Sequence, residues 1–196
     1  MPNIREILGA IGKPSGNVYT PSDDTFLMID VLNTLSLSDK EVLDLGTGPG
    51  VLGLLCAQMG ARVTVADIDD VALENATTAA RRLNLTVKAL RSDVFSDVTA
   101  RFDIVLFNPP YLPSDGTRDR AVDGGIGGRC LLDRFLIELP VHLKKNGYAL
   151  LLVSSLNNPA AVIDHHPELS FSEAASRSLF FEKLQVLLCK PRKLSS

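Results

Sequence analysis

The sequence predicts an α/β fold in which a mostly parallel sheet is covered by helices on both faces. Between residues 23 and 154, short apolar runs typical of buried strands alternate with segments of helical periodicity. A Gly-Thr-Gly-Pro-Gly turn follows the first apolar run, where many α/β proteins bind a nucleotide. Two strand-like runs near the C-terminus are too close in sequence for a crossover helix and should pair antiparallel.

Seven segments are predicted as strands because they are short and either continuously apolar or alternate between apolar and polar residues. In chain order they are 42–45, 62–66, 86–90, 102–107, 148–154, 169–176 and 183–189. The runs at 42–45, 102–107 and 148–154 are apolar almost throughout, as in strands that are buried on both faces of a sheet.

Five segments are predicted as helices from apolar residues spaced three and four apart and from capping residues. They are 23–35 with Ser22 as its cap, 51–59 ended by Gly60, 69–82 with Asp69 as its cap, 130–145 with a kink favoured at Pro140, and 159–165. Residues 1–20 are expected to form an N-terminal extension and a loop. The chain, 1–196, is interpreted as one domain.

The composition excludes several classes of protein. With 45% hydrophobic and 22% charged residues, the 196-residue chain resembles an ordinary globular protein rather than a disordered or fibrous one. Its net charge of −3 gives no general attraction to nucleic acid or to anionic membranes. Its three cysteines are far apart in sequence, which favours a reducing cytoplasm over a disulfide framework. No apolar run is long enough for a membrane span, so we expect a cytoplasmic protein.

The glycine turn at 46–50 predicts a nucleotide site, because glycines let the backbone approach a ligand and the following helix offers free N–H groups. Asp67 lies 21 residues after Gly46, at the end of the second predicted strand, where a carboxylate can accept hydrogen bonds from both ribose hydroxyls. Residues 48–53 also satisfy the pattern GxGxxG. A dinucleotide cofactor therefore stays open, as does a purely structural turn.

Two further carboxylates are candidates for the same site. Asp44 stands inside an apolar run and needs a partner, because burial of an unpaired carboxylate costs several kcal/mol. That partner is either the backbone N–H groups of its own turn or the amino group of a bound amino-acid moiety. Asp93 follows the third predicted strand, where it either caps a turn or accepts a hydrogen bond from an adenine amino group.

The tetrapeptide Asn108, Pro109, Pro110 and Tyr111 follows the fourth predicted strand and is the most specific signal in the chain. Two prolines leave carbonyls without neighbouring N–H groups, beside a side-chain amide and an aromatic face. The Asn108 oxygen and the Pro109 carbonyl can accept both hydrogens of a planar NH₂ group on which Tyr111 stacks. Two fixed acceptors favour the localised lone pair that develops as the nitrogen attacks. A packing role for the tyrosine is the alternative.

With these residues the chain resembles the class I S-adenosylmethionine-dependent methyltransferases that carry an Asn-Pro-Pro-Tyr motif. Within them it is most similar to the protein-(glutamine-N5) methyltransferases of the HemK kind, in the eukaryotic and archaeal branch that modifies peptide-chain release factors. Three stretches carry this closer resemblance: 18–27, 45–50 and 122–135. Ser22, Asp23 and the charged loop after Tyr111 depart from the branch's usual pattern.

The resemblance implies a Rossmann-like, seven-stranded sheet with an antiparallel last strand. It implies S-adenosylmethionine as cofactor, bound by Thr25, Asp44, Gly46, Gly48, Gly50, Asp67, Ile68, Asp93, Val94 and Asn108. Residues 108–111 would hold the substrate amide and form the catalytic centre, which needs no metal. The implied substrate is the glutamine of the Gly-Gly-Gln motif of a class 1 release factor.

Other functions stay open at the level of sequence. The same tetrapeptide suits an exocyclic base nitrogen, adenine N6 or guanine N2, which makes a nucleic acid the alternative substrate. A nucleotide-binding module without catalysis and a dinucleotide-dependent enzyme are further alternatives.

One partner is also implied by the resemblance. The strand at 86–90 should lie at an edge of the sheet, where few charges oppose pairing with another chain. Enzymes of this branch work with a small zinc-binding activator that docks there. A self-sufficient monomer is the alternative.

The neighbouring His165 and His166 look like a metal pair. They stand at the end of a predicted helix, before Pro167, where cationic side chains suit the helix dipole. We therefore expect a structural role for both.

Overall fold

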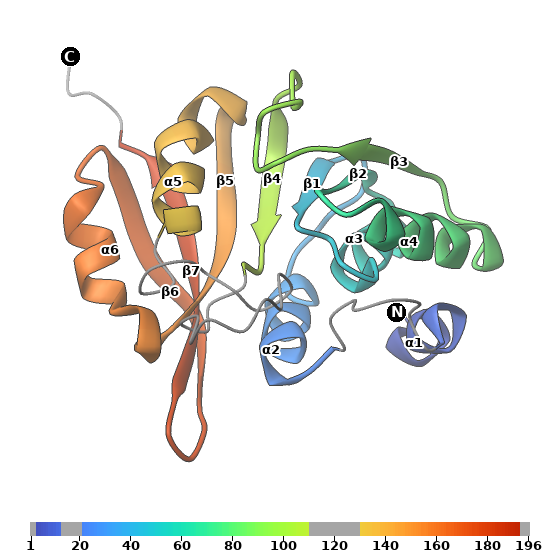
Figure 1. Cartoon of the computed structure of the whole chain (residues 1–196), viewed down its shortest axis with the longest axis horizontal. Helices are drawn as coiled ribbons and strands as arrows, with labels where there is room; N and C mark the ends of the chain where they lie inside the picture. Colours follow the sequence, from blue (N-terminus) through green and yellow to red (C-terminus); the bar gives the residue numbers. More distant parts are fainter. Residues whose placement is uncertain (1–2, 13–20, 110–129, 193–196) are drawn as a thin grey trace.

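Seven strands form one sheet in the computed structural model, which describes residues 3–12, 21–109 and 130–192 (Figure 1). The strand order is β3-β2-β1-β4-β5-β7-β6. The strands are β1 (Glu41–Leu45), β2 (Arg62–Asp67), β3 (Val87–Arg91), β4 (Phe102–Phe107), β5 (Leu143–Ser154), β6 (Leu169–Ser178) and β7 (Lys183–Pro191). Strands β1 to β5 pair in parallel, whereas β7 is antiparallel to both of its neighbours. The predicted fold class is therefore confirmed.

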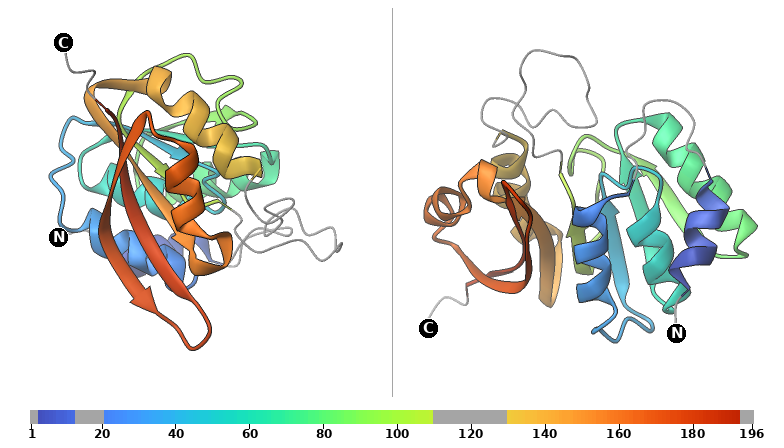
Figure 2. Two further views of the ribbon diagram at one scale, coloured as in Figure 1. Left: turned by 90° about the vertical axis from the view of Figure 1, so that its left-hand side faces the viewer. Right: turned by 90° about the horizontal axis from the view of Figure 1, so that it is seen from below.

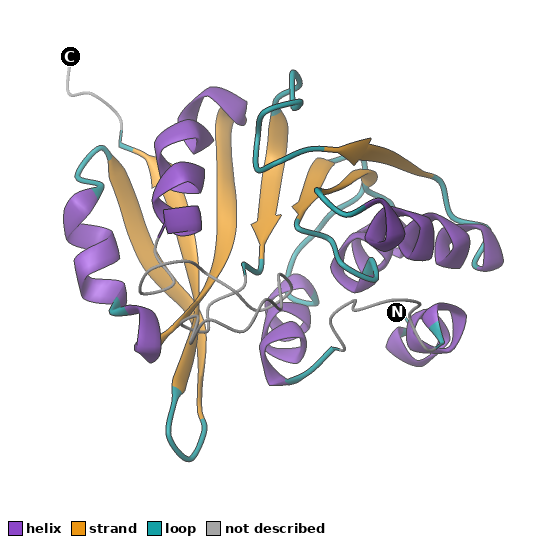
Figure 3. Cartoon of the chain, viewed as in Figure 1, coloured by secondary structure: helices purple, strands orange, loops and turns teal. Residues whose placement is uncertain are grey.

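Helices cover both faces of the sheet (Figures 2 and 3). They are α1 (Ile4–Ile11), α2 (Asp23–Leu32), α3 (Val51–Gln58), α4 (Asp70–Arg82), α5 (Cys130–His142) and α6 (Pro159–His165), with the short 3₁₀ helix η2 at Ser155–Asn157. Buried side chains of α1 to α4 form one hydrophobic cluster with the sheet, and those of α5 and α6 form a second. The sheet therefore has one hydrophobic core on each face. Parallel sheets are normally buried in this way on both faces.

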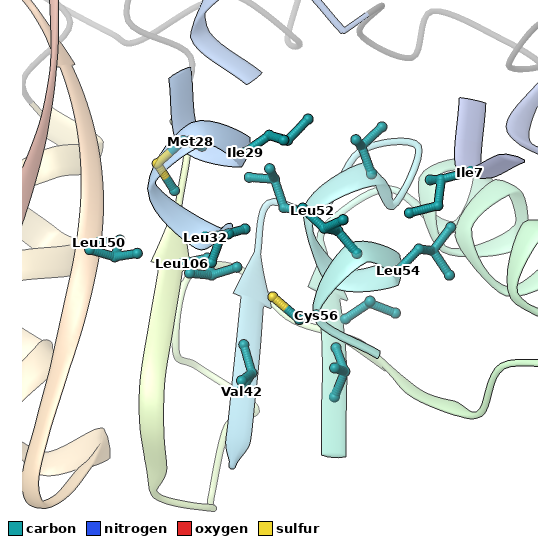
Figure 4. Packing of buried hydrophobic residues seen from close by; sticks show 14 of the residues in the cluster. Ile7, Met28, Ile29, Leu32, Val42, Leu52, Leu54, Cys56, Leu106 and Leu150 are labelled. Carbon is teal, nitrogen blue, oxygen red and sulfur yellow. The ribbon is translucent and has the colours of Figure 1, made fainter. Parts of the chain in front are cut away.

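The helix α1 is absent from the elements predicted by sequence analysis, which assigns no helix before residue 23. Asn3 caps it by accepting a hydrogen bond from the backbone N–H of Glu6, and its apolar face is fully buried at Ile7. In Figure 4, Ile7 points into the core beside Leu54 of α3. The helix therefore extends the first core beyond α4, through the spacing of Ile4, Ile7 and Ile11.

Three predicted boundaries differ from the structure by three or more residues. The helix predicted over 23–35 ends at Leu32, and the helix predicted over 130–145 ends at His142. Strand β5 begins at Leu143, five residues before the predicted start, because buried Leu143 already pairs with Phe102 of β4. The register shifts between that pair and Ile104–Tyr148, so the residues between form an irregularity that disguises the strand in the sequence.

The two edges of the sheet are formed by different kinds of strand pairing. As expected, β3 is an edge strand, paired only with β2, and the hairpin of β6 and β7 forms the opposite edge.

Among the described residues, no helix combines the length and the hydropathy that a membrane crossing requires.

Candidate active site

The glycine turn, Asp67 and Asn108 lie at the carboxyl ends of β1, β2 and β4, respectively. Strand β1 pairs with β2 on one side and with β4 on the other, so the sheet order reverses direction between β1 and β4 (Figure 1). Open α/β sheets bind ligands outside the carboxyl ends of the strands at such a reversal. The fold therefore places the glycine turn, Asp67 and Asn108 at one edge of the sheet.

The glycine turn connects β1 to α3 with its backbone in the left-handed region. Gly48 has φ +52°, and a Cβ built there would meet no atom within 4 Å, so its position faces open space. Gly50 has φ +92° and lies against α4, where a Cβ would come within 2.7 Å of the Ala76 methyl carbon. Packing thus requires the last glycine, whereas the middle one leaves room for a ligand.

Asp67 joins the end of β2 to this turn. Its Oδ2 accepts a hydrogen bond from the Gly48 backbone N–H (2.9 Å), and its Oδ1 accepts one from the Asp69 backbone N–H (3.0 Å). Partial burial raises the pKa of this carboxyl above its ordinary value, although both backbone hydrogen bonds act in the opposite direction. The next residue, Ile68, is 52% exposed and offers an apolar surface beside the carboxylate.

Asp44 is almost fully buried at the end of β1. Its Oδ2 accepts hydrogen bonds from the Thr47 hydroxyl (2.6 Å) and from the Gly53 backbone N–H (2.8 Å). Burial raises its pKa to about 6 despite these two bonds. Groups of the turn itself therefore supply the hydrogen-bond donors that a buried carboxylate needs. This agrees with the alternative in which Asp44 is satisfied by its own turn.

Asp93 is bound by a side chain that sequence analysis does not identify. Its carboxylate oxygens lie 3.2 and 3.1 Å from the two terminal nitrogens of Arg134 in α5. Asp93 and Arg134 are 41 residues apart in sequence, and no local pattern links them. The following Val94 has φ +53°, which is rare for a β-branched residue, and the Ser92 hydroxyl donates to its carbonyl (2.8 Å). Such backbone outliers cluster at ligand sites.

Asn108 is oriented by Asp24 in the first turn of α2. Asn108 Nδ2 donates to Asp24 Oδ2 (3.1 Å), and Asp24 Oδ1 accepts from the Thr25 backbone N–H (2.6 Å). Because a carboxylate accepts hydrogen bonds, the amide nitrogen of Asn108 must face Asp24, and its oxygen points the other way. That oxygen, Oδ1, is buried and has no hydrogen-bond partner among the described residues. A buried acceptor without a partner costs about 1–3 kcal/mol, which is expected where a ligand supplies the missing donor.

Of the other three residues of the Asn-Pro-Pro-Tyr motif, the structure describes only Pro109. Pro109 is buried directly after Asn108, whereas Pro110 and Tyr111 lie outside the described residues. Sequence analysis names Thr25 but not Asp24, although Asp24 makes the contact to Asn108 across 84 residues of sequence. The available signal was a second acidic residue at the helix start, where one suffices as a cap.

The two histidines have structural contacts. His166 is buried, with Nε2 3.3 Å from Asp133 Oδ1 and Nδ1 3.1 Å from Glu168 Oε1, so it joins α6 to α5. The ring of His165 lies 2.6 Å from the Ala161 carbonyl oxygen within α6. Within the described ranges, no group of three or more metal-ligating side chains occurs.

A family model described as methyltransferase small domain matches residues 22–163. A Methanocaldococcus jannaschii protein provisionally named protein N5-glutamine methyltransferase is 38% identical over 193 residues, covering 94% of this chain and 97% of that protein. Human methyltransferase HEMK2 is 29% identical, covering 91% of this chain and 92% of the human protein.

Two solved structures share the fold. The E. cuniculi Mtq2–Trm112 complex, which is responsible for methylation of the eRF1 translation termination factor, superposes with a TM-score of 0.74 and 27% identity. That match covers 90% of this chain and 100% of the other. A T. thermophilus 16S rRNA guanine-N2 methyltransferase, solved with S-adenosylmethionine and guanosine, gives a TM-score of 0.68 and 23% identity over 44% of its own chain.

Proposed function

Because this chain belongs to the methyltransferase small domain family, we propose that it transfers a methyl group from S-adenosylmethionine to a glutamine side chain of a protein. The acceptor is the glutamine of the Gly-Gly-Gln motif of a class 1 peptide-chain release factor. Relatives whose names specify glutamine methylation, or whose structure is tied to a termination factor, support this substrate over almost the full length of the chain. A substrate that acts in translation supports a cytoplasmic location for the enzyme.

The carboxyl edge of the sheet fits S-adenosylmethionine. The open space at Gly48 would admit the amino-acid part of the cofactor, Asp67 would accept from the ribose hydroxyls, and the exposed Ile68 would pack on the adenine. Asp93 and the backbone of Val94 would border the adenine, and Thr25, Asp44, Gly46 and Gly50 would frame the cofactor. When bound, the cofactor supplies an electrophilic methyl group on a sulfonium centre.

The unpartnered Oδ1 of Asn108 is the single observation that carries the proposal. A glutamine side chain ends in an NH₂ group, whose N–H satisfies this oxygen. Because Asp24 holds Nδ2, the Asn108 amide cannot turn its own NH₂ toward the substrate without losing a hydrogen bond. The site is therefore set to accept a hydrogen bond from the substrate nitrogen.

This arrangement activates a weak nucleophile without a strong base. The lone pair of an amide nitrogen is delocalised into its carbonyl, and an acceptor that holds the N–H out of the amide plane favours the localised form. The Pro109 carbonyl would accept the second hydrogen, and Tyr111, which lies outside the described residues, is expected to stack on the amide plane. As the amide nitrogen formed its bond to the methyl carbon, the carbon–sulfur bond of the sulfonium would break and S-adenosylhomocysteine would leave with a neutral sulfur. The nitrogen would then release one proton to water.

Nucleic acid is the second candidate substrate, because an exocyclic amino group of a base is also a planar NH₂ group. The net charge of −3 gives it no electrostatic support, since phosphate neutralisation dominates binding to nucleic acid. The matched rRNA methyltransferase shares only 44% of its chain with this protein. Protein is therefore the favoured substrate.

A methyl-transfer assay tests the proposal directly. The protein is incubated with S-adenosylmethionine and, in parallel, with a class 1 release factor, ribosomal RNA and DNA. We expect a mass gain of one methyl group on the peptide that holds the Gly-Gly-Gln glutamine. Transfer to RNA or DNA alone would overturn the proposal, and titration calorimetry that detects NAD binding but no S-adenosylmethionine binding would overturn the cofactor assignment.

A small zinc-binding activator subunit at β3 is part of the proposal. Strand β3 is paired on one side only, and Lys88 and Ala89 are exposed along it. An unprotected edge strand accepts a strand from another chain. The Mtq2 structure is itself a complex with Trm112, which supports a heterodimer for this chain as well.

A further inference from the structure

Two large aromatic side chains stand almost fully in solvent at the tip of the β6–β7 hairpin. Phe180 is 93% exposed and Phe181 is 87% exposed, and their rings meet edge to face with centroids 4.8 Å apart. They occupy a tight turn in which the Leu179 backbone N–H donates to the Glu182 carbonyl (2.7 Å). Single exposed apolar residues are common, but an adjacent pair of exposed aromatics is typical of an interaction surface.

The tip extends past the edge of the sheet at which the candidate active site lies. Strand β5 runs parallel to β4 and ends at Ser154, which pairs with Leu184 of β7. The hairpin turn at 179–182 therefore projects beyond the carboxyl end of β5, on the same edge as Asn108 after β4. Figures 1 and 2 show the hairpin protruding from the body of the molecule on this edge.

An ion-pair bridge ties this hairpin to the helix that orients Asn108. The guanidinium of Arg177 in β6 donates to Asp23 Oδ1 (3.0 Å) and to Asp30 Oδ2 (2.9 Å), both in α2. Asp23 directly precedes Asp24, whose carboxylate holds the Asn108 amide. Helix α2 thus contacts both the hairpin that carries the exposed aromatics and the side chain of Asn108.

From these observations we propose that the hairpin tip, defined as residues 179–182, is a docking surface for the folded protein that carries the methyl-accepting glutamine. Phe180 and Phe181 pack into an apolar recess of that protein. This inference rests on the proposed function. Asn108 can recognise any planar amide, so selection of one glutamine in one protein requires contacts away from the amide. An anionic membrane is disfavoured as occupant, because Glu182 and the net negative charge would be repelled by it.

The test compares the wild type with the double variant Phe180→Ser/Phe181→Ser on two substrates, a purified class 1 release factor and a short peptide containing Gly-Gly-Gln. Both side chains are exposed, so the fold should be unaffected. We expect KM for the release factor to rise at least about tenfold, with kcat and the peptide kcat/KM unchanged within about twofold. The matched control is Ile137→Ser, which removes a 67% exposed apolar side chain of α5 and should change neither substrate's KM.

Each other outcome has a definite meaning. If the wild type methylates the release factor and the double variant retains its KM, the docking surface is wrong and the proposed function stands. If the wild type, co-expressed with the activator, methylates neither protein nor peptide, both are wrong. Loss of self-association or of binding to anionic vesicles in the double variant, with KM unchanged, would assign the tip to a second copy or to a membrane and overturn the proposal.

Discussion

At the scale of single residues, the candidate active site depends on long-range pairs. Asp24 holds Asn108 across 84 residues of sequence, and Arg134 holds Asp93 across 41. Asn108 and Asp93 can be predicted from local patterns, because each follows a predicted strand. The roles of Asp24 and Arg134 cannot, since the reason for each is a partner that only the folded chain brings near.

Replacement of Asn108 by alanine tests the acceptor role of its oxygen. We expect kcat/KM for the release factor to fall at least about 100-fold, because the lost hydrogen bond strengthens as the nitrogen develops its lone pair. The Kd for S-adenosylmethionine, measured by calorimetry, should change by less than about threefold. Turnover close to that of the wild type would contradict the amide-activation mechanism.

Replacement of Asp67 by alanine tests the ribose site. Removal of the carboxylate deletes the acceptor for two ribose hydroxyls and leaves the Gly48 N–H without its partner. At about 1.5–3 kcal/mol for each charge-assisted hydrogen bond, the Kd for S-adenosylmethionine should rise at least about tenfold. Asp70→Ala is the matched control, since Asp70 is an exposed neighbour that pairs with Arg91. Equal cofactor affinity in both variants would remove Asp67 from the site.

At the scale of elements, periodicity and capping residues predict most strands and helices. They do not predict the bounds of segments with an irregular backbone. The strand β4 and the helix α6 have the bounds expected from their apolar runs and flanking residues. The start of β5 does not, because Asn146 with φ +67° and Gly147 interrupt the apolar pattern after Leu143. Helix α1 spans only eight residues, so its stability comes from packing on α3 and α4 rather than from local signals.

The β3 edge gives a prediction about partner binding. The isolated protein at tens of micromolar should self-associate in light scattering, and co-expression with the activator should yield a monodisperse heterodimer of higher activity. Ala89→Glu adds a charge to the exposed edge and should reduce heterodimer yield. Ala160→Glu, at an exposed position of α6, is the control. A monodisperse and fully active monomer would contradict the partner proposal.

At the scale of the whole molecule, carboxyl groups with raised pKa values and a carboxyl group with a lowered pKa lie at opposite ends of the strands. Asp103, at the amino ends of the strands, has a lowered pKa because the Glu41 N–H and Lys144 bind its carboxylate. Asp44 and Asp67, at the carboxyl ends, have raised pKa values because burial disfavours their charge. The candidate active site is thus at the edge where burial opposes the charge of two carboxylates, as is common at functional sites.

This asymmetry predicts how stability depends on pH. In the unfolded chain Asp44 ionises near its ordinary pKa of 3.8, whereas in the folded protein its pKa is about 6. Between these values the folded state holds the extra proton, so stability falls as pH rises and then levels off above about pH 7. The total effect is about 3 kcal/mol. Chemical denaturation from pH 4 to 8 should show this loss in the wild type relative to Asp44→Asn, which lacks the titrating group.

The same titration separates the two interpretations of Asp44. If its carboxylate also meets the amino group of the cofactor, S-adenosylmethionine binds the ionised form better, and its Kd should decrease as pH rises through about 6. If Asp44 only closes its own turn through Thr47 and Gly53, the Kd should be nearly independent of pH in that range while the stability profile keeps its slope. A stability difference between wild type and Asp44→Asn that stays constant from pH 4 to 8 would contradict the raised pKa itself, because no proton would then separate the folded from the unfolded state.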